Sequence, residues 1–350
     1  MSRKLCRLVA LAMSGLVMTV SGEGMAGPVG LNYGLTKTLP LDGPTRWDYL
    51  TFDAKEQRLF VTRGERVDVL DTNSGKVIGS IADLKGVHGV ALAPELNRGY
   101  ISDGSANSVV VFDLATLKPV GTIPVGTKPD AIVYDESTRR VFVANGGSGD
   151  LTAIDATTGM VVGSVELGGK PEFAVVNGNG QLFVNVEDRS QLIAVDTANL
   201  TIVVRYDLAP SCVSPTGLAI DIAQSRLFAV CRNKVMVVVD VGTGKIRSAL
   251  PIGDASDAAI FDPESKLAFS SNGDGTLTVV DARAADHCEV AGTIATAPTA
   301  RTMALAPTTH RIYLAAAETD GVDPPTAERP HPRPHFKPGS FVILTVEPKR

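Results

Sequence analysis

The sequence is poor in charged and aromatic residues. Of its 350 residues, 20% are charged and 5% are aromatic, whereas Gly occurs 34 times and Pro 21 times. Little charge, many turn-forming residues and many Val, Ile, Leu and Thr favour many short strands over long helices.

The sequence also lacks a surplus of positive charge. Its formal net charge is −5, and removal of residues 1–26 (three basic residues and one acidic) changes this to −7. Nonspecific binding to nucleic acid and docking on anionic lipid both depend on a basic surface. We therefore expect no nucleic-acid partner, and no membrane contact after the leader has been removed.

No apolar run is long enough to span a membrane comfortably. The longest, Leu8–Val20, follows the basic residues Arg3, Lys4 and Arg7, and it precedes a small-residue stretch ending at Ala26. This order is typical of a secretory signal peptide. We predict a signal peptide at 1–26, a short linker at 27–34, and a periplasmic or secreted protein; an uncleaved anchor is the alternative.

Motifs for common chemistries are missing. The sequence contains no phosphate-binding loop, no dinucleotide fingerprint and no haem attachment pair. The serine in Gly146–Gly149 lies in a hairpin rather than in a nucleophile elbow, and Asn272–Gly275 lacks the closing Glu of a calcium loop. The sequence therefore indicates no catalytic residues.

What the sequence does contain is a repeat. A unit of four short strands runs from Pro129 to Val165, and the Asp that closes its third strand recurs at steps of 42, 42, 41, 44 and 41 residues. The recurring residues are Asp71, Asp113, Asp155, Asp196, Asp240 and Asp281. A four-strand unit of about 40–45 residues is the period of a β-propeller blade.

Seven first strands can be counted, and the last unit lacks its fourth strand. The segment Leu35–Leu41 resembles the fourth strand Val120–Val125 of another unit. We predict an all-β, seven-bladed propeller over 35–350, with four-stranded blades and an N-terminal strand that completes the last blade. A Pro-rich insertion at 318–339 interrupts that blade.

Two repeat segments also carry a family resemblance. Val141–Asn145 and Leu59–Thr62, each followed by a Val-rich strand ending in Asp, resemble the YVTN-type β-propeller repeat family of YncE-like periplasmic proteins. The resemblance covers 35–346. It implies periplasmic or surface proteins of varied function, some of which accompany quinoprotein or haem oxidoreductases, and at least one of which binds single-stranded DNA.

Polar residues recur where the first strands begin. Aligned blades place seven of them at one level of the central channel: Asp48, His88, Asp130, Glu172, Thr216, Asp257 and Arg301. Converging carboxylates repel one another. We therefore predict a ligand-binding ring, with Asp130, Glu172 and Asp257 as candidate oxygen ligands for Ca²⁺ or Mg²⁺; a simply hydrated channel is the alternative.

The Pro-rich insertion belongs to the same face by topology. Its prolines lead us to expect that it joins no sheet. A lid, a partner-docking arm and a tolerated surface insertion all remain open. His331 and His335 lie within it, but two histidines alone are weak evidence for a copper or zinc site.

Three of the four cysteines follow the leader. Cys212 precedes the first strand of the fifth blade and Cys231 ends its second strand. These strand ends meet at one face, so we predict a Cys212–Cys231 disulfide, which an oxidising compartment permits. Cys288 is left over, in a loop at the opposite face.

These observations support three functions. The first is a monomeric, noncatalytic scaffold that binds a small ligand or a periplasmic protein through the face with the ring and the Pro-rich loop. The second is a hydrolase of the sugar-lactonase type that uses the channel carboxylates and a divalent cation. The third is an accessory subunit of a periplasmic oxidoreductase.

Overall fold

The structure, a computed structural model, describes residues 32–324, 326 and 334–349. The predicted signal peptide and most of the predicted linker lie outside these residues. In the described part, the regular elements are strands and two single-turn 3₁₀ helices, η1 (Pro94–Leu96) and η2 (Glu187–Arg189). No helix of this part is both long and apolar enough to cross a bilayer.

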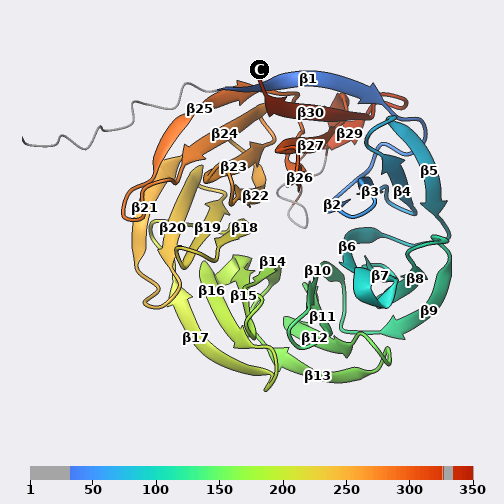
Figure 1. The fold of residues 1–350 in the computed structure, drawn as a ribbon, viewed down its shortest axis with the longest axis horizontal. Helices are drawn as coiled ribbons and strands as arrows, with labels where there is room; N and C mark the ends of the chain where they lie inside the picture. The colour runs from blue at the N-terminus through green and yellow to red at the C-terminus, as the bar shows by residue number, and fades with distance from the viewer. Residues whose placement is uncertain (1–31, 325, 327–333, 350) are drawn as a thin grey trace, which may run out of the picture.

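Seven four-stranded antiparallel sheets surround a central axis, as predicted (Figure 1). Blades 1 to 3 comprise β2 (Leu50–Asp53), β3 (Arg58–Thr62), β4 (Val67–Asp71) and β5 (Lys76–Ile81); β6 (Val87–Ala93), β7 (Arg98–Asp103), β8 (Ser108–Asp113) and β9 (Pro119–Pro124); and β10 (Pro129–Asp135), β11 (Arg140–Asn145), β12 (Asp150–Asp155) and β13 (Val161–Glu166). Blades 4 to 6 comprise β14 (Pro171–Val176), β15 (Gln181–Val186), β16 (Gln191–Asp196) and β17 (Thr201–Asp207); β18 (Pro215–Asp221), β19 (Arg226–Cys231), β20 (Val235–Asp240) and β21 (Ile246–Pro251); and β22 (Ser256–Asp262), β23 (Leu267–Asn272), β24 (Thr276–Asp281) and β25 (Glu289–Ala295).

The seventh blade joins the two ends of the chain. Its strands, from the axis outward, are β26 (Thr302–Ala306), β27 (Arg311–Ala316), β30 (Val342–Pro348) and β1 (Tyr33–Pro40). The N-terminal strand therefore completes the last blade, as the sequence predicts, and it begins two residues earlier than expected. Figure 1 shows β1 and β30 side by side at the closing seam.

The repeated Asp stabilises the turn after the third strand in blades 1 to 6. Oδ1 of Asp71 accepts hydrogen bonds from the backbone N–H and the hydroxyl of Ser74. Asp155 does the same with Thr158. Asp side chains favour such turns because they can replace a backbone acceptor. The period that reveals the fold is thus a period of hairpin turns.

The apolar core lies between blades rather than within any one of them. Seven clusters of buried apolar side chains each join two neighbouring blades; one contains Phe60 of blade 1 and Phe112 of blade 2, with ring centroids 5.8 Å apart. A single blade cannot bury both of its faces, so the ring is stable only as a whole.

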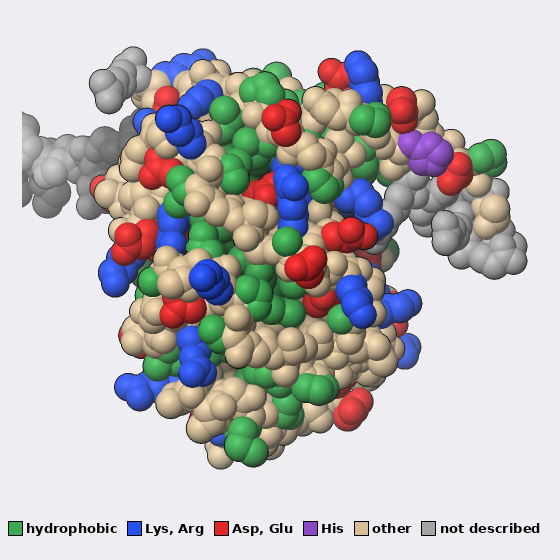
Figure 2. All heavy atoms as spheres, turned by 90° about the vertical axis from the view of Figure 1, so that its right-hand side faces the viewer, with side chains coloured by type: hydrophobic (Ala, Val, Ile, Leu, Met, Phe, Trp, Pro, Cys, Tyr) green, Lys and Arg blue, Asp and Glu red, His purple; other side chains and the backbone are tan. Residues whose placement is uncertain are grey.

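The outer wall of the ring carries charges of both signs. On the side shown in Figure 2, Lys and Arg side chains alternate with Asp and Glu side chains, and apolar side chains lie between them. This side therefore presents no field of a single sign.

The Pro-rich insertion differs from its expectation. Its described ends pair as a separate two-stranded sheet, β28 (Thr319–Val322) with β29 (Pro334–Phe336), so the prediction that it joins no sheet is wrong. Pro334 is the first residue of β29, a position where a missing N–H is tolerated. Phe336 packs on Trp47, with centroids 4.9 Å apart, which holds the hairpin beside the first strand of blade 1.

Candidate functional site

Five of the seven predicted ring positions lie at β-bulges where the first strands begin, and Asp48 and Arg301 lie just before β2 and β26. In blade 3, Pro129 pairs with Asn145 and the ladder resumes at Ile132, so Asp130 is the first unpaired residue. A bulge of this kind re-aims the side chain of its unpaired residue. The register breaks at the equivalent positions of blades 2, 4, 5 and 6: His88, Glu172, Thr216 and Asp257.

Six of the seven predicted residues form what we call the axial ring: Asp48, His88, Asp130, Glu172, Asp257 and Arg301. Thr216 does not present its hydroxyl there. It is fully buried, and its Oγ1 donates to the backbone O of Ser256 at 2.9 Å. A Cβ on the next residue, Gly217, would lie 2.5 Å from Cα of Ala258, so blades 5 and 6 approach closely at this level.

Three residues of the axial ring converge on one point. Nδ1 of His88 lies 2.6 Å from Oδ2 of Asp48 and 3.6 Å from Oδ1 of Asp130. Within the described part of the chain, one ligand atom from each of these residues can be chosen so that all lie within 4.8 Å of one another. Oδ1 of Asp130 is buried and has no hydrogen-bond partner among the residues that the structure describes.

The other two carboxylates of the axial ring have cationic partners. Nε of Arg301 lies 3.0 Å from Oδ2 of Asp257, and Nζ of Lys170 lies 3.0 Å from Oε2 of Glu172. The three predicted oxygen ligands therefore have different surroundings, since Asp130 faces Asp48 and His88 whereas Glu172 and Asp257 are each paired with a cation.

A second layer of charge surrounds Lys170. Glu187, on η2, contacts Nζ of Lys170, and its Oε1 lies 2.7 Å from Nε of Arg232. Together with the axial ring, this gives five carboxylates and three cations, a formal net charge of −2 when every carboxylate is ionised and His88 is uncharged.

Burial and mutual repulsion raise the pKa values of three carboxylates of the axial ring. Burial, and then the charge of Asp48, raise the pKa of Asp130 to about 7. Burial, and then Asp130, raise the pKa of Glu172 to about 8. Burial also raises the pKa of Asp257, against the effect of Arg301. Groups with strongly shifted pKa values are concentrated at functional sites.

Two aromatic rings meet across the axis one residue further along the strands. Tyr49, next to Asp48, packs edge to face on Phe173, next to Glu172, with centroids 5.3 Å apart. These residues come from blades 1 and 4, whose inner strands lie across the channel from each other in Figure 1. Burial and the surrounding carboxylates raise the pKa of Tyr49 well above its usual value.

Small polar side chains hold the backbone of the ring positions. The hydroxyl of Ser102 donates to the backbone O of Asp130, and that of Ser271 donates to the backbone O of Arg301. Sequence reasoning missed these residues, as well as Tyr49 and Phe173. Both serines are the penultimate residue of a second strand that is otherwise mostly apolar, and this position is the signal that could have found them.

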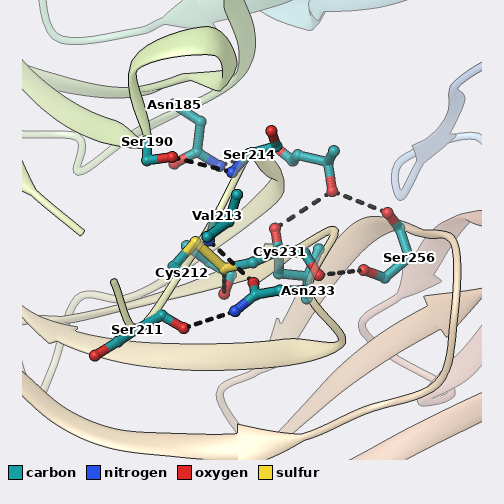
Figure 3. Close-up of a disulfide and its surroundings, with 12 residues drawn as sticks. Asn185, Ser190, Ser211, Cys212, Val213, Ser214, Cys231, Asn233 and Ser256 are labelled. Carbon is teal, nitrogen blue, oxygen red and sulfur yellow. Dashed lines mark hydrogen bonds between the residues drawn. A yellow bond between two sulfur atoms is a disulfide. The ribbon is translucent and has the colours of Figure 1, made fainter. Parts of the chain in front are cut away.

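The predicted disulfide is present beside this site (Figure 3). Sγ atoms of Cys212 and Cys231 are joined, their Cα atoms are 5.5 Å apart, and both residues are fully buried. The backbone N–H of Arg232, directly after Cys231, donates to the backbone O of Val213 and Ser214. The disulfide loop thus fixes the backbone that presents Arg232 to Glu187. Cys288 is left without a disulfide partner, as expected, and it is buried.

A cavity of about 170 Å³ lies away from the axial ring, at the seam between blades 7 and 1. Its lining includes Lys37, Asp71, Arg311 and Glu347. Nε of Arg311 already donates to Oε2 of Glu347 at 2.6 Å. We assign no function to this cavity because its charged side chains include a satisfied pair, while the perturbed carboxylates lie at the axis.

The architecture defines a seven-bladed β-propeller closed by its N-terminal strand. A family model described as outer membrane protein assembly factor BamB matches residues 63–285, more than half of the chain, and the protein belongs to this family. Among solved structures, hydrazine synthase of Kuenenia stuttgartiensis is similar, with a TM-score of 0.68 and 17% identity over 79% of this chain and 92% of that chain. At this identity the likeness shows the fold alone. No curated protein sequence matches the chain.

Proposed function

We propose that this protein is an exported, noncatalytic binding propeller whose axial-ring face recognises a cationic group on a small ligand or a protein partner. The observation that carries the proposal is the surplus of partly buried carboxylates at that face. Their pKa values are raised by burial and by one another, so a bound cation would relieve their repulsion.

Two features support binding at this end of the channel. The Tyr49–Phe173 contact crosses the axis just beneath the ring, which favours a ligand that enters from the ring face. The β28–β29 hairpin stands beside the same face through the Phe336–Trp47 contact, and it offers a protein partner a second surface.

The family and the disulfide support an exported scaffold. The description of the family names an assembly factor, which favours a binding role over catalysis. A buried disulfide persists best in an oxidising compartment, in agreement with the signal-peptide pattern. Within this setting we assign the chain to the YVTN-type repeats on the segments Val141–Asn145 and Leu59–Thr62.

A hydrolase of the sugar-lactonase type is the second candidate. It is favoured by His88, whose Nδ1 lies at hydrogen-bond distance from Asp48 and close to Asp130, an arrangement that could orient a general base. This alternative requires turnover, which the binding function does not.

The proposal is tested by thermal melts in EDTA with spermidine and glycine betaine as cationic probes and sorbitol as a neutral one. We expect a cationic probe to raise the melting temperature of the wild type but not of the Asp130→Asn, Glu172→Gln double variant. The matched control is Glu264→Gln, a carboxylate whose side chain is 79% exposed in the loop between β22 and β23. Equal shifts in the wild type and the double variant would overturn the proposal, and gluconolactone turnover that is lost in the double variant would establish the hydrolase instead.

A further inference from the structure

The group formed by Asp48, His88 and Asp130 differs from the rest of the axial ring in its counter-charge. Glu172 and Asp257 each have a cation within 3.0 Å. The carboxylates of Asp48 and Asp130 instead face one imidazole, at 2.6 and 3.6 Å. The two carboxylates therefore converge on one imidazole, whereas each of the other two carboxylates of the axial ring has a cation of its own.

The spacing of the ligand atoms suits a small metal ion. With metal–ligand bonds of about 2.1 Å, neighbouring ligand atoms in octahedral or tetrahedral sites lie about 3.0–3.4 Å apart. The two distances from Nδ1 of His88 bracket this range. Among the described residues, the buried Oδ1 of Asp130 has no hydrogen-bond partner and lies 3.6 Å from Nδ1 of His88, which supplies an independent sign of a missing ligand.

The backbone that carries these side chains is held in place. The hydroxyl of Thr302 donates to the backbone O of Asp48 at 2.8 Å, and that of Ser102 donates to the backbone O of Asp130. Gly104 makes room for the imidazole, because a Cβ at that position would lie 2.7 Å from both Cδ2 and Nε2 of His88. Ligands fixed in this way lose little freedom when a metal binds.

We propose that Asp48, His88 and Asp130 form a binding site for one divalent first-row transition ion, such as Zn²⁺ or Mn²⁺. The proposal rests on the proposed function in that it uses the same face and the same preference for cations. One imidazole and two carboxylates suit these ions better than Ca²⁺ or Mg²⁺, which prefer oxygen ligands alone. Three protein ligands leave coordination positions for water or for a ligand that enters from the ring face.

The direct test is equilibrium dialysis followed by elemental analysis on untagged protein that has been stripped with EDTA. We expect the wild type to bind one equivalent of Zn²⁺. Mn²⁺ should compete with Zn²⁺ for the same site, and Ca²⁺ should bind much more weakly. His88→Ala and Asp130→Asn should weaken Zn²⁺ binding by roughly 100-fold, and Gly104→Ala by roughly 10-fold through displacement of the imidazole. Co²⁺ bound to the wild type should show a visible absorption band that His88→Ala removes.

Two controls exclude other sites. Glu172→Gln should retain Zn²⁺, because Glu172 is paired with Lys170. A His331→Ala, His335→Ala double variant should also retain it. Circular dichroism checks that each variant is folded. Absence of stoichiometric Zn²⁺ binding in the wild type, or equal binding in His88→Ala, overturns the metal site; spermidine binding lost in the double carboxylate variant would then still support the proposed function.

Discussion

Tyr49 of blade 1 and Phe173 of blade 4 pack edge to face across the propeller axis, with ring centroids 5.3 Å apart. Each follows a carboxylate of the axial ring, Asp48 and Glu172, in the chain. The contact thus joins two blades that share no strand pairing, and it places an apolar layer directly beneath a charged one.

Loss of this contact should destabilise the whole ring. We expect Tyr49→Ala to lower the free energy of unfolding by about 2–4 kcal/mol, because it removes an aromatic pair and leaves a void at the axis. Tyr49→Phe keeps the ring and should stay within about 1 kcal/mol of the wild type. Urea unfolding followed by circular dichroism measures both. Equal stability of the Ala and Phe variants would show that the contact across the axis contributes nothing.

The raised pKa values of Asp130 and Glu172 predict a pH dependence of stability. Each group takes up its proton at higher pH in the folded state, at about 7 and about 8, than in the unfolded chain. The folded state therefore binds more protons between about pH 4 and 8, and stability falls as the pH rises through this window. The contribution is complete below pH 4 and is lost above pH 8.

The difference between wild type and variant isolates this effect. Asp240, whose pKa is lowered to about 2 by hydrogen bonds from Arg247 and Thr243, acts in the opposite direction and loses its contribution only in strong acid. Relative to the wild type, the Asp130→Asn, Glu172→Gln double variant should gain about 2–4 kcal/mol between pH 5 and pH 8. Urea unfolding in EDTA across this range is the measurement, and parallel curves for the two proteins would contradict the prediction.

The sequence predicts the blades well because the signal for each blade is local in the chain and is repeated. The Asp that closes the third strand of blades 1 to 6 accepts hydrogen bonds within its own turn, so its period does not depend on packing between blades. The first-strand alignment follows from the same period. It gives Asp130 and His88 equivalent positions, and in the structure each is the residue after a paired strand start.

The details of the site depend on contacts between blades, which a repeat does not encode. Thr216 occupies the ring position of its strand. Blades 5 and 6 approach closely at Gly217, however, and the Thr216 hydroxyl donates to the backbone O of Ser256 instead of facing the channel. The Tyr49–Phe173 contact joins residues more than a hundred positions apart across the axis. The pairing of Glu172 with Lys170 likewise depends on side-chain conformation rather than on spacing.

The closing seam offers a third prediction. Tyr33 of β1 is 6% exposed and packs on Phe269 of blade 6, with centroids 5.4 Å apart. Tyr33→Ala should lower the free energy of unfolding by about 3 kcal/mol. Leu35, on the same strand but 41% exposed, provides the control, since Leu35→Ala should cost less than about 1 kcal/mol. A similar loss in both variants would mean that the strand closes the ring through its backbone alone.

The fourth prediction concerns the Cys212–Cys231 disulfide, whose presence a count of free thiols tests. In the chain expressed from Gly27 onward, the denatured, unreduced protein should show one free thiol, that of Cys288, and three after reduction.

The Cys212→Ala, Cys231→Ala double variant should lose about 3 kcal/mol of stability, because the bridge closes a loop over a sequence separation of 19. Cys288→Ala leaves the bridge intact and should leave the spermidine-induced shift in melting temperature unchanged. The double variant should weaken that response, since the bridged loop fixes the backbone of Arg232 beside Glu187. A double variant with full stability would show that the packing of blade 5 holds this loop without the bridge.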